Sequence, residues 1–123
     1  TTLRVRWLEA NAAAGLGESA RAEALWREVR SGFIAAELPY DVALVTLDLT
    51  VLYLEQGRTD EVKALAREIV RVFLLLNIHR EAYAAAILFQ QAVEMETATL
   101  ALAQRLAQVL RAAQSNLGLA FRG

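Results

Sequence analysis

The chain has 123 residues, no cysteine and a net charge of −1, and 56% of its residues are hydrophobic. Its length corresponds to one domain, and its charge gives no overall attraction to nucleic acid or to an anionic membrane. The absence of cysteine excludes disulfides and thiolate chemistry. The longest unbroken apolar run, Ala82 to Phe89, has eight residues, whereas a membrane-spanning helix needs about 20. A cytoplasmic and a surface-assembled location both stay open.

Helical periodicity and helix-terminating residues predict an all-α fold without strands. Gly17 and Gly57 are expected to end helices because glycine accepts positive φ. Pro39 suits a first helical turn, and Ser19 and Thr59 are expected to cap the helices that follow them. The predicted helices span about residues 3–14, 19–36, 39–57, 59–76, 80–94 and 99–113. The segment 115–123 is expected to be an irregular tail after a domain over residues 1–114.

The stretch 38–73 is the expected centre of the fold. Its first half, from Val42 to Leu54, is apolar almost throughout, so the third helix should be covered on several sides. Its second half is amphipathic, which is typical of a helix with one buried face.

The chain repeats with an offset of 40 residues. Gly17 then aligns with Gly57 and Phe33 with Phe73, and core, cap and surface positions between them match in type. This pattern predicts three helical hairpins, over about residues 3–38, 39–78 and 79–114, with turns at Gly17, at Gly57 and near Thr97. Each hairpin needs its neighbour to cover its open face.

The central stretch resembles a tetratricopeptide repeat, in which a large–small pair, an aromatic, a glycine and small residues let two helices nest. The residues that carry the resemblance are Leu49, Thr50, Tyr53, Gly57, Val62 and Ala66. Thr50, Val62 and Ala66 depart from the family's usual Gly, Ala and aromatic, and the period exceeds about 34. The same stretch resembles helical-repeat segments at the C-termini of bacterial regulators. The resemblance implies an α-solenoid of three TPR-like hairpins that binds other proteins.

Catalytic and metal-binding features are absent from the sequence. His79 is the only histidine, and a zinc site needs several histidine, cysteine or carboxylate ligands. We therefore expect no catalytic, cofactor or metal site. Asp48 interrupts the apolar third helix, and a buried carboxylate needs a partner. We expect it either to pair with an arginine of the chain or to contact a bound partner.

The ends of the array carry apolar residues where a solenoid normally has a polar capping helix. The sequence thus predicts a non-catalytic scaffold for protein–protein interaction that also forms a homo-oligomer, joined head to tail as a ring or a helical filament. The expected self-association residues are Leu3, Trp7, Leu8, Leu102, Leu106, Leu110, Leu119 and Phe121. The alternative is a partner- or ligand-sensing repeat segment excised from a larger bacterial regulatory protein, which the start at Thr1-Thr2 without methionine also fits.

Overall fold

The computed structural model describes residues 2–75, 80–94 and 100–122, with side chains for residues 3–71, 86–91, 93–94 and 101–115. All of the described secondary structure is helical, so the prediction of an all-α fold is confirmed. The helices are α1 (Thr2–Gly15), α2 (Ser19–Ala35), α3 (Pro39–Glu55), α4 (Thr59–Leu75), α5 (Arg80–Glu94) and α6 (Leu100–Arg122). The predicted turn near Thr97 lies outside the described residues, as does His79.

The first three turns share one backbone conformation, which recurs every 20 residues. Gly17, Glu37 and Gly57 all have positive φ, at +79°, +57° and +71°. The residue after each one donates its backbone N–H to the carbonyl oxygen five positions earlier, at 2.9, 3.1 and 2.9 Å. This hydrogen bond is the hallmark of the Schellman motif that ends many helices. The predictions at Gly17 and Gly57 are confirmed, whereas at Glu37 the sequence lacks the glycine that this conformation favours.

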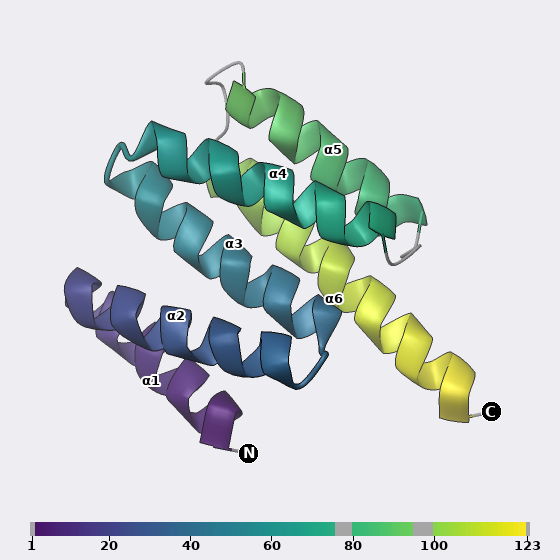
Figure 1. Cartoon of the computed structure of the whole chain (residues 1–123), viewed down its shortest axis with the longest axis horizontal. Coiled ribbons are helices and arrows are strands. Elements are labelled where there is room, and N and C mark those ends of the chain that lie inside the picture. Colours follow the sequence, from purple (N-terminus) through teal and green to yellow (C-terminus); the bar gives the residue numbers. More distant parts are fainter. Residues whose placement is uncertain (1, 76–79, 95–99, 123) are drawn as a thin grey trace.

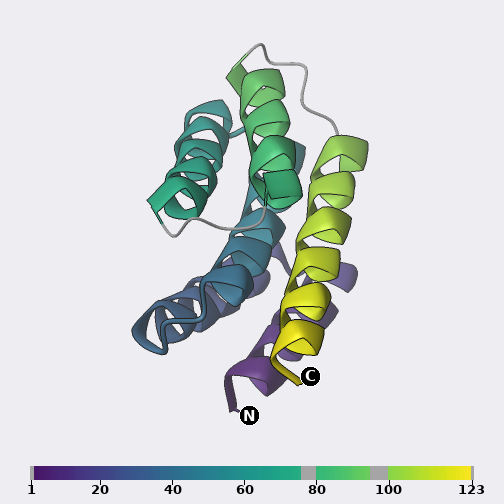
Figure 2. The ribbon, with the colours of Figure 1, turned by 90° about the vertical axis from the view of Figure 1, so that its right-hand side faces the viewer.

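The α3 helix lies at the centre of the molecule. It packs against α2 and α4 and also against α6, and Figure 1 shows it between α2 and α4. Figure 2 shows that α2 and α4 lie on one side of α3 and that α6 lies on the other. Buried side chains therefore occur on every face of α3, as its continuous apolar sequence predicted.

The α6 helix is longer than predicted and crosses the molecule. It continues to Arg122, so the irregular tail expected over residues 115–123 was wrong. It packs on both α5 and α3, and this contact closes a cycle of four helices, α3, α4, α5 and α6. Figure 1 shows α6 running antiparallel to α3.

The packing of α6 corrects part of the predicted self-association surface. Leu106 and Leu110 are 2% and 0% exposed and belong to the chain's own hydrophobic core. They were expected to form an uncovered terminal face, but the contacts of α6 with α3 and α5 cover them. These two leucines stabilise the fold and are not accessible to another chain.

Candidate functional site

Two residues predicted to contact partners contact each other within the chain. Trp7 Nε1 of α1 donates a 2.6 Å hydrogen bond to Asp48 Oδ2 of α3. The Trp7 and Phe33 rings also pack in a T-shaped arrangement, with 5.4 Å between ring centroids. Burial raises the pKa of Asp48 to about 6, although the Trp7 hydrogen bond and the Arg111 charge both oppose this rise. Asp48 therefore has an intramolecular partner, as one prediction held, but its hydrogen-bond donor is an indole and not an arginine.

A second carboxylate on the same face of α3, that of Asp41, connects α3 to both α1 and α6. Asp41 is 3% exposed and accepts hydrogen bonds from Arg4 of α1 at 3.3 Å and from Gln114 of α6 at 3.2 Å. Asp41 and Asp48 are seven residues apart, or two helical turns. Together they form a polar seam that fixes α1 and α6 on α3.

The other predicted self-association residues fall into different environments. Leu3 and Trp7 are half-buried, whereas Leu8 is 67% exposed and Leu102 is 36% exposed. The side chains of Leu119 and Phe121 lie outside the described residues. Among the predicted residues whose side chains are described, Leu8 and Leu102 thus offer the most apolar surface to another molecule.

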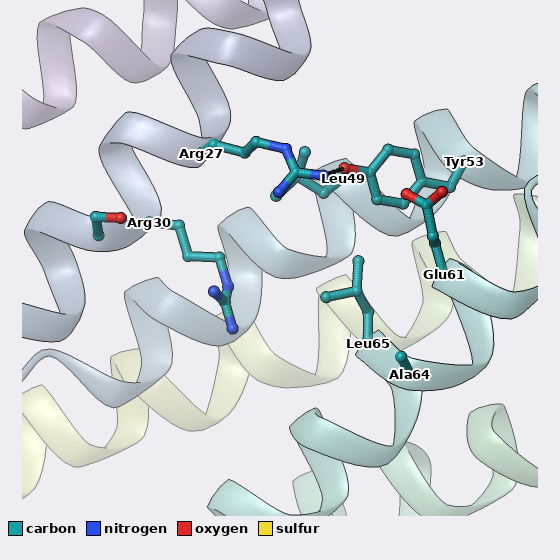
Figure 3. Close-up of a pocket in the computed structure, with 8 residues that line it drawn as sticks. Arg27, Arg30, Leu49, Tyr53, Glu61, Ala64 and Leu65 are labelled. Carbon is teal, nitrogen blue, oxygen red and sulfur yellow. Dashed lines mark hydrogen bonds between the residues drawn. The ribbon is translucent and has the colours of Figure 1, made fainter.

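A cavity of about 230 Å³ opens on the opposite side of α3, between α2 and α4 (Figure 3). We call it the α2–α4 cavity. Arg27 and Arg30 enter it from α2, and Leu65 lies on the α4 wall. The complete lining is Arg27, Arg30, Ser31, Leu49, Tyr53, Glu61, Ala64 and Leu65.

Glu23 is the centre of an ion-pair network beside the cavity. Its carboxylate accepts hydrogen bonds from Arg58 at 2.8 Å, from Tyr53 at 3.0 Å and from Arg27 at 3.1 Å. These contacts, led by the Arg58 hydrogen bond, lower the pKa of Glu23 despite its desolvation. Arg58 also lies over the Tyr53 ring, 4.1 Å from its centroid. The network therefore holds the side chains of α2 and α3 in fixed positions around the cavity.

Arg30 connects three helices at the other end of the cavity. Its Nε donates to Thr46 Oγ1 of α3 at 2.9 Å, and its Nη2 pairs with Glu68 of α4. Sequence reasoning did not single out Arg27 and Arg30 as site residues. Their spacing of three places both on one face of a helix, which is the signal that could have found them.

The described part of the chain contains neither a cluster of metal-binding side chains nor a membrane-spanning helix. It contains no group of three or more His, Asp or Glu side chains placed to hold a metal ion. Its helices also include none long and apolar enough to cross a membrane.

Comparison with known proteins gave no matching family model, no matching curated protein and no matching solved structure. The arrangement of side chains is thus the basis for any assignment of function.

Proposed function

We propose that this chain is a non-catalytic, tetratricopeptide-like scaffold for protein–protein interaction, and that one of its partners is a second copy of itself. The proposal takes the three hairpins as repeat units of a solenoid. It rests on the apolar surface left exposed at the two ends of the row of helices.

The observation that carries the proposal is an exposed apolar stripe on α1. Val5 and Leu8 are 54% and 67% exposed, and their spacing of three places them close to one face of the helix. Leu16, which is 75% exposed, follows directly after the end of α1. At the 40-residue offset of the sequence repeat, the counterpart of Val5 is Val45, which is fully buried. Val45 lies between Asp41, which accepts a hydrogen bond from Gln114 of α6, and Asp48, near which Arg111 of α6 contributes its charge. In the second repeat unit α6 thus covers the face that α1 leaves open.

The opposite end of the helix row carries a second apolar surface. Leu88 of α5 is 65% exposed, and Leu102 of α6 adds a partly exposed side chain. Figure 1 shows α1 and α5 at opposite edges of the molecule. A contact between two such different surfaces is head-to-tail, and it repeats until a ring closes or a helical filament forms.

The energy of such a contact comes from apolar burial. Removing apolar surface from water contributes about 25 cal/mol per Å², and association must also offset an entropic cost of at least about 4 kcal/mol. A stable interface usually buries at least about 1,000 Å² in total. The interface must therefore bury further side chains beside the α1 stripe. We expect the head-to-tail contact to extend along the whole length of α1.

The proposal is tested by placing a charge on the stripe. Leu8→Asp should lower the average mass measured by sedimentation at a fixed concentration, whereas Ile34→Asp should not. Ile34 is 49% exposed and lies on α2, outside the α1 stripe, so it is a matched control. Equal masses for Leu8→Asp and the unmodified chain would contradict a role for α1 in association.

A further inference from the structure

The α2–α4 cavity contains hydrogen-bond donors that no described residue of the chain engages. Arg27 donates through Nε to Glu23 and through Nη2 to Tyr53, and Arg30 donates through Nε to Thr46 and through Nη2 to Glu68. Among the described residues, no hydrogen bond engages Nη1 of either arginine. Since a guanidinium carries five N–H donors, each of these two arginines can still bind an acceptor from outside the chain.

The carboxylate that lines the same cavity is already paired with a cation of the chain. Glu61 accepts hydrogen bonds on both of its oxygens from Arg58, including one of 2.9 Å from Nε. Its charge is thereby compensated within the protein. Arg27 and Arg30 are paired in the same way, with Glu23 and Glu68, so the preference of the cavity for an anionic group rests on the remaining N–H donors of the two arginines and not on a net positive charge.

The remaining wall of the cavity is apolar. Leu49 of α3 and Ala64 and Leu65 of α4 line it. Figure 3 shows Leu49 beside the Arg27 guanidinium and Leu65 facing the space toward Arg30. A cavity of about 150 Å³ holds a benzene molecule, which has six heavy atoms. On the same scale, the observed volume of about 230 Å³ suits about nine heavy atoms, enough for a short aliphatic acid.

We propose that the α2–α4 cavity binds a small organic acid. The carboxylate of the acid accepts hydrogen bonds from Nη1 of Arg27 and of Arg30, and its short aliphatic chain packs against Leu49 and Leu65. Small-ligand sites combine an apolar wall with a few convergent polar groups in this way. This binding site is separate from the α1 stripe, so it does not depend on self-association.

The test is an NMR titration of the isotope-labelled chain with hexanoate at constant ionic strength, and with hexanamide as the uncharged analogue of equal size. Hexanoate should produce saturable shifts in α2, α3 and α4, and hexanamide should bind at least tenfold more weakly. The proposal is overturned if hexanoate gives no saturable shifts, or if both compounds bind equally.

Two variants separate the two halves of the site. Arg27→Gln should weaken hexanoate binding about tenfold, the effect of losing one charge-assisted hydrogen bond. Ala64→Phe should abolish binding by filling the cavity without changing its charge. Arg67→Gln is the matched control, because it breaks the 2.7 Å pair with Glu94 outside the cavity and should leave hexanoate affinity unchanged. With helical circular dichroism retained, unchanged hexanoate affinity in Ala64→Phe would contradict the site.

Discussion

The indole of Trp7 and the carboxylate of Asp48, 41 residues apart in the chain, are joined by a hydrogen bond of 2.6 Å. This bond connects α1 to the side of α3 that also carries α6. The Asp48 pKa of about 6 means that the folded chain binds a proton here more tightly than the unfolded chain, in which aspartate titrates near 3.9. Stability contributed by this group therefore falls as the pH rises through this interval and is lowest above about pH 6.

The first prediction is that Asp48→Asn stabilises the chain at pH 7 and has little effect at pH 4. Asparagine keeps an oxygen that can accept from Trp7 but carries no charge to desolvate. The rise of the Asp48 pKa from its ordinary value to about 6 corresponds to a loss of folding free energy of roughly 3 kcal/mol at pH 7. We expect Asp48→Asn to restore about 1–2 kcal/mol of this stability, since the substitution also removes the attraction between Asp48 and Arg111. Urea unfolding at the two pH values measures the difference.

Trp7 itself can report the titration of Asp48. Trp26 bonds to Asn11 at 3.2 Å, at a separate place, so a Trp26→Phe background leaves Trp7 as the only indole. Its fluorescence should change with a midpoint near pH 6, and this change should disappear when Asp48→Asn is added. A midpoint near pH 4 would show that burial does not raise the Asp48 pKa.

The second prediction concerns the turn at Glu37. A non-glycine residue with positive φ costs about 1–2 kcal/mol, so Glu37→Gly should stabilise the chain by about 1 kcal/mol after the added entropy of the unfolded glycine. Gly17→Ala should destabilise it by a similar amount, because Gly17 has a φ of +79°. Gly15→Ala is the control, since Gly15 lies within α1 and a Cβ there meets nothing within 4 Å. Because alanine is more favourable than glycine in a helix by up to about 1 kcal/mol, thermal unfolding should place Glu37→Gly and Gly15→Ala at or above the unmodified chain and Gly17→Ala below it.

The third prediction concerns the Glu23 network and has the opposite pH dependence. Because the folded chain lowers the pKa of Glu23, its contribution to stability is present above pH 4.5 and is lost as the pH falls through the lowered pKa. Glu23→Gln should thus cost roughly 1–2 kcal/mol at pH 7 and less at pH 3. The exposed Glu9→Gln should change stability little at either pH. A cost for Glu23→Gln that grows on acidification would disprove this assignment.

Local signals in the sequence predicted the helices better than they predicted the contacts between them. Gly17, Gly57 and Pro39 mark helix ends through backbone conformation alone, and these ends are confirmed. The continuation of α6 beyond Ala113 and the burial of Leu106 were missed, because both depend on packing against α3, which is distant in sequence.

The candidate site shows the same limit. Trp7 and Asp48 were both recognised as unusual, yet nothing local to either residue indicates that α1 brings them together. The α2–α4 cavity is likewise built from three helices, and only the spacing of Arg27 and Arg30 on α2 could be read from the sequence. Pairing across helices requires the helix packing to be known first.

The central claim is that this chain assembles with itself through its apolar ends, and the mass of the unmodified chain across a wide concentration range tests it most directly. Light scattering should show a weight-average mass that rises with concentration above the 13.6 kDa of one chain. The rise should reach a plateau for a closed ring or continue for a filament, and Leu8→Asp should suppress it. A mass that stays at 13.6 kDa at the highest concentration would contradict the claim.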